Sequence, residues 1–87
     1  MPRVIRAPLA EDDLLEIWLT IAADNPAAAD RMLDRISEVC TKLGRTPRLG
    51  VQRPELGDGI RSFPVGQYVI FYRLNAKDLQ ILRVLSG

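Results

Sequence analysis

The spacing of apolar residues changes once along this chain of 87 residues, and that change limits the folds open to it. Between residues 8 and 43 apolar side chains recur every three or four positions, which is the period of an amphipathic helix. From residue 60 onward they fall in short runs rich in β-branched and aromatic residues, a pattern typical of strands. The segment between, residues 44–59, holds four glycines and two prolines. We therefore expect a helical half, a loop and a sheet-forming half.

The helical half divides into two predicted helices. Pro8 suits the first turn of a helix, and the acidic residues that follow it favour a helix N-terminus. Asn25 and Pro26 predict the N-cap and first position of a second helix, which Gly44 and Pro47 are expected to end. Each helix carries an apolar stripe, and a sheet is the expected cover for both. The stripes comprise Leu14, Trp18 and Ile21 flanked by Leu15, Leu19 and Ala22, and then Ala29, Met32, Leu33, Ile36, Val39, Cys40 and Leu43.

Four segments are expected to form strands. A short strand over residues 3–7 precedes the helices, and three later runs predict strands over Ile60–Pro64, Gln67–Leu74 and Leu79–Leu85. The tetrapeptides PVGQ and NAKD suit tight turns between these runs. The expected order is β-α-α-β-β-β, an α+β fold in which a helical hairpin packs on a small antiparallel-rich sheet. A chain of this length suits a single domain over residues 1–87.

The composition argues against most catalytic and metal chemistry. No histidine is present, which removes the commonest general base and metal ligand. The single cysteine, Cys40, lies on the stripe of the second helix and is expected to be a small core residue. No glycine-rich phosphate-binding motif occurs in the sequence. We therefore expect no catalytic residues, no metal site and no cofactor.

The sequence also predicts where the protein works. Its first residues contain no apolar stretch typical of a secretory signal, and no run approaches the ~20 apolar residues that span a bilayer. A single cysteine cannot form an internal disulfide, which agrees with a reducing compartment. These features predict a cytoplasmic protein without a membrane partner.

Arginine dominates the cations of the second half. Seven basic and three acidic residues give residues 44–87 a charge of +4, whereas five basic and eight acidic residues give residues 1–43 a charge of −3. Ten of the twelve basic residues are arginine, whose guanidinium group suits bidentate contacts with phosphate or carboxylate. The candidates for holding a partner's anions or phosphate are Arg48, Arg53, Arg61, Arg73 and Arg83.

Arg83 is surrounded by apolar sequence. Strict strand alternation places it on one face with Leu79 and Ile81, where a charge needs an acidic partner, backbone carbonyls or an external anion. One possibility is an internal ion pair with Glu55 or Asp58. The other is a guanidinium cluster poised for phosphate or for a partner's carboxylates. The sequence leaves both open.

Several segments together resemble the ParE toxins of the ParE/RelE superfamily, the toxic halves of type II toxin–antitoxin pairs. The segments are DNPAAAD, RPELG, IRSFPVG and the final RVLSG, and the resemblance covers nearly the whole chain. It implies the same β-α-α-β-β-β order and a bacterial toxin neutralised by a ParD-like antitoxin. Characterised ParE toxins act on DNA gyrase, whereas RelE-type relatives cut messenger RNA on the ribosome.

This resemblance leads to three functional hypotheses. A toxin that binds and inhibits gyrase needs no acid–base residues, which suits the composition. A ribosome-dependent endoribonuclease would use Arg61 and Arg83, which match basic positions of the RelE-type nucleases. A degenerate toxin would serve only as an antitoxin-binding module.

The antitoxin is expected to contact two parts of the toxin. An acidic, amphipathic antitoxin segment should cover the helical hairpin at Leu15, Trp18 and Leu19. The same segment should reach the side of the sheet that carries Arg61 and Arg83. No direct sequence-specific contact with nucleic acid is expected.

Overall fold

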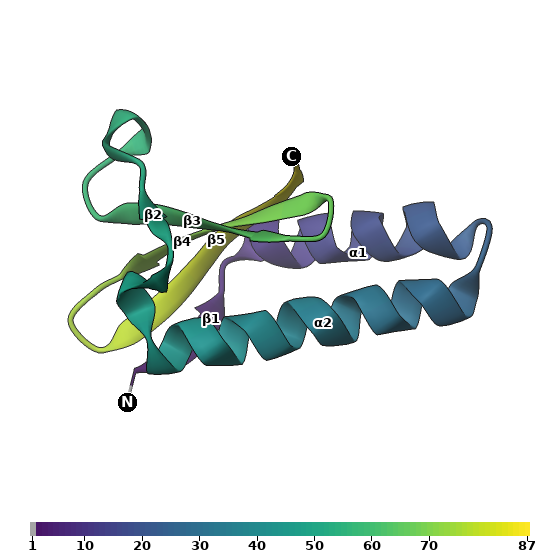
Figure 1. Ribbon diagram of the computed structural model, residues 1–87, viewed down its shortest axis with the longest axis horizontal. Coiled ribbons are helices and arrows are strands. Elements are labelled where there is room, and N and C mark those ends of the chain that lie inside the picture. The colour runs from purple at the N-terminus through teal and green to yellow at the C-terminus, as the bar shows by residue number, and fades with distance from the viewer. Residues whose placement is uncertain (1) are drawn as a thin grey trace.

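The computed structural model describes residues 2–87 and shows two helices packed against a five-stranded mixed sheet (Figure 1). The predicted α+β class is confirmed, and the order of elements matches the predicted β-α-α-β-β-β except for one additional strand. Residues 44–59, expected to be a loop, also contain a two-residue strand and two single 3₁₀ turns. The elements are β1 (Arg3–Arg6), α1 (Pro8–Ala22), α2 (Pro26–Arg45), η1 (Pro47–Leu49), β2 (Val51–Gln52), η2 (Pro54–Leu56), β3 (Ile60–Val65), β4 (Tyr68–Leu74) and β5 (Asp78–Ser86).

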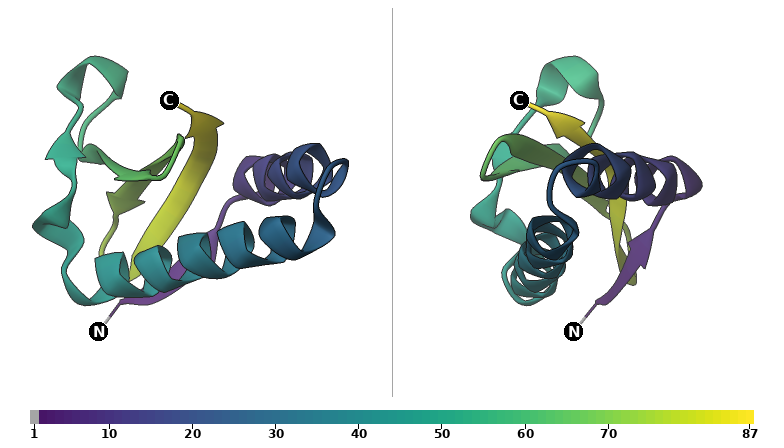
Figure 2. Two further views of the ribbon diagram at one scale, coloured as in Figure 1. Left: turned by 45° about the vertical axis from the view of Figure 1, so that its right-hand side comes forward. Right: turned by 90° about the vertical axis from the view of Figure 1, so that its right-hand side faces the viewer.

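The strands lie in the order β1-β5-β4-β3-β2. Strand β1 pairs in parallel with β5, from Arg3 opposite Asp78 to Arg6 opposite Ile81, and the other neighbours are antiparallel. The two views of Figure 2 show β1 lying beside the long β5 strand, so segments from opposite ends of the sequence are neighbours in the sheet. An exposed ion pair of 3.2 Å between the Arg3 Nε and Asp78 Oδ1 atoms joins them.

Helices α1 and α2 run antiparallel, and the turn between them lies beyond the sheet at the right of Figure 1. The Asn25 side chain accepts a hydrogen bond from the Ala28 N–H at 3.1 Å, which confirms the predicted N-cap of α2. Near the same end, the Trp18 indole N–H donates to Asp30 Oδ1 at 2.8 Å. This hydrogen bond links the projecting ends of the two helices. Trp18, expected on the apolar stripe that the sheet covers, is half-buried.

Gly44 does not end the second helix as predicted, because α2 continues to Arg45. A Cβ atom at Gly44 would lie 2.8 Å from Cγ2 of Val4 in β1, well inside van der Waals contact. The glycine therefore allows the first strand to pass close to the helix. Pro47 begins η1 two residues after the helix ends, which agrees with the expected role of proline in stopping it.

The core lies between the two helices and the sheet face toward them, and Cys40 is buried there as expected. Tyr72 in β4 is fully buried, and its hydroxyl accepts from Gly50 N–H at 2.8 Å and donates to the Pro47 carbonyl at 2.7 Å. These two bonds anchor the chain after α2 to the central sheet. The other core residues are Ala10, Leu14, Ile17, Ile36, Leu43, Val65, Ile70, Leu79, Ile81 and Val84.

An irregularity in β5 reverses the alternation predicted for its second half. Phe71 of β4 lies opposite Arg83, but the next residue, Tyr72, lies opposite Ile81, so Leu82 is an extra residue in a β-bulge. Beyond the bulge Val84 takes the core side of the sheet. Arg83 therefore does not share a face with Ile81, and the expectation based on strict alternation is wrong.

Candidate functional site

Arg83 is held by Asp13, a residue of helix α1 that lies 70 positions away in the sequence. Its Nε and Nη2 atoms donate to the two carboxylate oxygens of Asp13 at 2.8 and 2.9 Å. The Val84 N–H donates to the same carboxylate at 2.9 Å. An internal ion pair was one of the two sequence-based possibilities, but the partner is neither Glu55 nor Asp58.

The environment of this pair stabilises its ionised form. The Asp13 side chain is 9% exposed, whereas that of Arg83 is 41% exposed. The hydrogen bonds from Arg83 hold the pKa of the Asp13 carboxyl below its usual value, and the Val84 N–H acts in the same direction, while burial opposes both. The Asp13 carboxylate is therefore charged at neutral pH, and it links α1 to the edge of β5.

Arg61 is also bound within the protein. Its Nη1 atom donates to the Gly50 carbonyl at 2.8 Å and lies 3.5 Å from the Arg48 carbonyl. Arg53 donates from Nε to the hydroxyl of the buried Ser62 at 2.8 Å. Both guanidinium groups thus help to hold the segment between α2 and β3 against the sheet.

Arg61 and Arg83 lie on opposite faces of the sheet. Residues directly opposite in neighbouring strands share a face, and Arg61 is opposite Tyr72 whereas Arg83 is opposite Phe71. Because Phe71 and Tyr72 are consecutive, their side chains point to opposite faces. The expected side of the sheet bearing both arginines therefore does not exist, and one bound phosphate would meet only one of them at close range.

The remaining two candidate arginines are outward-facing. Arg48 in η1 and Arg73 in β4 are exposed. Their guanidinium groups form no hydrogen bond or ion pair with other residues in the range 2–87. The five predicted arginines therefore form no single cluster, and Arg48 and Arg73 are the members whose charge is available to a partner.

A shallow apolar hollow of about 270 Å³ lies on the sheet face away from the helices. Arg83 is at its margin, and Phe71 and Leu82 form part of its wall. Sequence reasoning did not identify this site, although its signal is present in the strand runs YVIFY and LQILRVL, which are apolar at positions facing both sides. The other lining residues are Leu56, Ile60 and Leu85.

Helix α1 exposes a second apolar feature. Leu15 and Leu19 are 59% and 54% exposed, and their spacing of four residues places them on the same side of the helix. The half-buried Trp18 lies between them in sequence. These three residues were predicted to receive the antitoxin, and the structure shows that the two leucines are not used by the protein's own core.

Residues 2–87 contain no group of three or more carboxylate, thiol or imidazole side chains placed to hold a metal ion. Within the same range, neither helix is both long and apolar enough to cross a membrane.

Comparison with known proteins agrees with this architecture. The sequence profile of the family described as the ParE toxin of the type II toxin–antitoxin system parDE matches residues 4–87. The toxin ParE3 of Caulobacter vibrioides is 39% identical over the whole chain, and the match covers 88% of that protein.

A solved structure described as the chromosomal ParDE toxin–antitoxin system of P. aeruginosa has the same fold. It superposes with a TM-score of 0.83 at 24% identity, and the match covers 99% of this chain and 96% of that one.

Proposed function

The chain belongs to the ParE toxin family of type II toxin–antitoxin systems, and from this membership we propose that it inhibits DNA gyrase by binding to it. The family match over residues 4–87 carries the proposal. The toxin is proposed to act as one domain in the cytoplasm, where gyrase and its DNA are found. Inhibition by binding requires surface complementarity and no proton-transferring group.

The arrangement of the arginines supports binding over RNA cleavage. A nuclease that uses Arg61 and Arg83 would need both guanidinium groups around one phosphate. Instead the two residues lie on opposite faces of the sheet, and each donates to an acceptor of the protein itself. The apolar hollow beside Arg83 and the exposed charges of Arg48 and Arg73 supply a surface for a macromolecular partner.

We further propose that a ParD-like antitoxin neutralises the toxin by covering the exposed side of α1. Leu15 and Leu19 form an apolar pair at the spacing that an amphipathic partner segment recognises. Acidic residues on that segment would complement the charge of Arg48 and Arg73. The contact is not expected to include Arg61, because its guanidinium is bound to the Gly50 carbonyl.

The gyrase proposal is tested with purified gyrase and relaxed plasmid DNA. Added toxin should stop supercoiling by gyrase. Toxin that has first been mixed with its antitoxin should not stop it. If saturating toxin neither slows supercoiling nor stabilises a cleaved gyrase–DNA complex, the proposal is wrong. Primer extension on translated messenger RNA from the same toxin preparation then tests the ribonuclease hypothesis, and a toxin inactive in both assays is a degenerate one.

The antitoxin proposal is tested by reversing the character of the α1 surface. A variant carrying Leu15→Glu and Leu19→Glu should bind a ParD-like antitoxin at least about tenfold more weakly, because two apolar contacts are replaced by charges. Leu9→Glu is the matched control, since Leu9 is 56% exposed on the same helix but lies outside the Leu15/Leu19 pair. Equal antitoxin affinity in the double variant and the control would refute this placement.

A further inference from the structure

One edge of β5 is only half covered by a neighbouring strand. Strand β1 pairs with β5 from Asp78 to Ile81, and the last contact of this kind is the Ala7 N–H bonded to the Ile81 carbonyl at 2.9 Å. Past this point the chain turns into helix α1. On that side, residues Val84–Ser86 have no strand beside them.

The direction of the backbone groups along this open edge follows from one hydrogen bond. The Val84 N–H is bonded to Asp13, so it points away from β4. Groups at every second residue of an antiparallel strand point the same way, which directs the Val84 carbonyl and both backbone groups of Ser86 outward. The position after Ser86 agrees, because the Gly87 N–H donates to the Gln67 carbonyl, on the side of β4, at 2.8 Å. One donor and two carbonyls are therefore directed to the open side.

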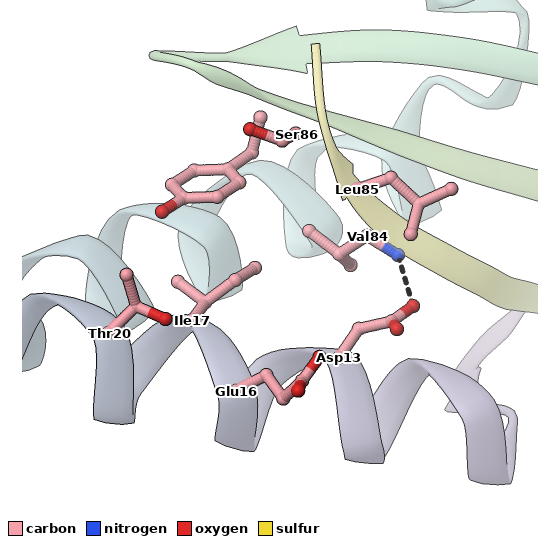
Figure 3. Close-up of a pocket in the computed structure, with 8 residues that line it drawn as sticks. Asp13, Glu16, Ile17, Thr20, Val84, Leu85 and Ser86 are labelled. Carbon is pink, nitrogen blue, oxygen red and sulfur yellow. Dashed lines mark hydrogen bonds between the residues drawn. The ribbon is translucent and has the colours of Figure 1, made fainter.

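A hollow of about 210 Å³ lies between this edge and helix α1. Figure 3 shows Asp13 against Val84, Glu16 and Thr20 on the following turns of the helix, and Ser86 at the end of the strand. The floor of the hollow is apolar and includes Ile17. The Asp13–Val84 contact closes it at one end, so the free backbone groups face the part beside Glu16 and Thr20.

Glu16 gives the hollow its charge. Asp13 is already paired with Arg83, whereas Glu16 is exposed and has no ion-pair partner among residues 2–87. The apolar Leu85, between Val84 and Ser86 on the strand, borders both this hollow and the 270 Å³ hollow on the outer sheet face. A strand placed beside Ser86 would therefore have one side facing a carboxylate and the other side facing apolar surface.

We propose that the Val84–Ser86 edge of β5 binds an extended segment of a partner protein by strand addition. The segment has the pattern apolar–basic–apolar, because side chains alternate along a strand. Its lysine or arginine enters the hollow toward Glu16, and the two apolar residues lie against the side of Leu85. The residues that line the site do not include Leu15 or Leu19, and the proposal stands whether or not gyrase is the target.

The probe is a blocked pentapeptide of sequence Thr-Val-Lys-Val-Thr, titrated at millimolar concentrations into isotope-labelled full-length protein. The Ser86 amide resonance should shift, and its exchange with solvent should slow, because it donates to the peptide. The same peptide with glutamate in place of lysine should bind more weakly, since Glu16 repels it. Absence of any shift at Ser86, or equal binding of both peptides, overturns the proposal.

Two pairs of variants separate the backbone contact from the charge contact. Ser86→Pro removes the outward N–H without removing a hydrogen bond to β4. It should lower the affinity for the lysine peptide at least about tenfold, whereas Ser86→Ala should leave that affinity unchanged. Glu16→Gln should lower the affinity for the lysine peptide about two- to fivefold, as expected for an exposed ion pair. Glu38→Gln, at an exposed position on α2, should leave that affinity unchanged.

Thermal unfolding shows whether these substitutions preserve the fold. Unchanged peptide affinity in a folded Ser86→Pro protein would refute strand addition. Protection of the Ser86 amide that rises with protein concentration in the absence of peptide would refute a foreign partner segment, because a second copy of the chain would then occupy the edge.

Discussion

The contact between Asp13 and Arg83 makes a quantitative prediction about stability. Asp13→Ala removes the acceptor of the Val84 N–H, and Val84 is 2% exposed, so water reaches that donor poorly. A buried donor without a partner costs about 1–3 kcal/mol. Removing one member of a fully buried ion pair costs about 3–5 kcal/mol, but the Arg83 side chain is 41% exposed and can be hydrated again. We therefore expect a loss of about 2–3 kcal/mol in the free energy of unfolding.

Asp13→Asn separates the charge from the hydrogen bond, because the asparagine oxygen can still accept from Val84 N–H. Asp13→Asn should lower the free energy of unfolding by about 1 kcal/mol, the usual net contribution of one hydrogen bond. Arg83→Met should cost less than Asp13→Ala, since the carboxylate keeps its bond to Val84. For a domain of this size, 1 kcal/mol corresponds to about 4–8 °C in melting temperature. Asp13→Ala should therefore melt about 10–20 °C below the unchanged protein.

The same contact fixes the sign of the pH dependence. The pKa of Asp13 is lowered in the folded protein, chiefly by Arg83, from an ordinary value of 3.8. A lowered pKa means that the stabilisation is complete above the unfolded-state pKa and is lost as pH falls through the folded-state value. Urea unfolding followed by circular dichroism at pH 7, 5, 4 and 3 measures this directly. The difference between the unchanged protein and Asp13→Asn should be constant from about pH 7 to 5 and should shrink below about pH 4.

Two results would refute this reasoning. The first is a free energy of unfolding for Asp13→Ala within ~0.5 kcal/mol of that of the unchanged protein, which is the range of an ordinary surface substitution. The second is a difference in free energy of unfolding between the unchanged protein and Asp13→Asn that vanishes between pH 7 and 5, where the carboxylate remains charged. Either outcome would mean that the Asp13 carboxylate contributes nothing through Arg83 and Val84.

Three further substitutions test other contacts. Tyr72→Phe removes the hydroxyl that is hydrogen-bonded to Gly50 and Pro47. The free energy of unfolding in urea should fall by about 1–3 kcal/mol, and residues 46–59 should be cleaved faster by a protease. An unchanged rate of proteolysis would show that these two bonds do not anchor the segment. Gly50→Ala should destabilise the protein to a similar degree, because its Cβ would clash with the Tyr72 hydroxyl, and an unaltered melting temperature would contradict this packing. Asp30→Ala removes the acceptor of the hydrogen bond from the indole N–H of Trp18, the only tryptophan in the sequence. The substitution should change the tryptophan fluorescence and lower the melting temperature by a few degrees. An identical emission spectrum would mean that the bond does not form in solution.

The local pattern of the sequence predicted most of the helices and strands, because their periods and caps depend on near neighbours. Asn25 and Pro26 marked the start of α2 correctly, and Asn75 in NAKD forms the expected turn by accepting from the Asp78 N–H. Gly44 was misjudged because its role depends on Val4, a residue of a distant strand. Local signals carry no information about such an approach.

The candidate site was harder to predict for the same reason. The partner of Arg83 is 70 residues away on a helix whose acidic residues were explained by its N-terminus. The bulge at Leu82 leaves no mark in the apolar pattern, yet it decides which face Arg83 occupies. Leu15 and Leu19 could be identified as apolar from the sequence, but only the packing of α1 shows that they are left exposed.

The parallel pairing of β1 with β5 has a consequence for how the toxin is made. During translation, Arg3–Arg6 leave the tunnel more than 70 residues before their strand partners at 78–81. Because β5 also carries the carboxylate contact to α1 and lies between β1 and β4, the nascent chain cannot complete its sheet early. Contacts so distant in sequence form late. The sheet, and any function that depends on it, is therefore completed only after β5 has been synthesised.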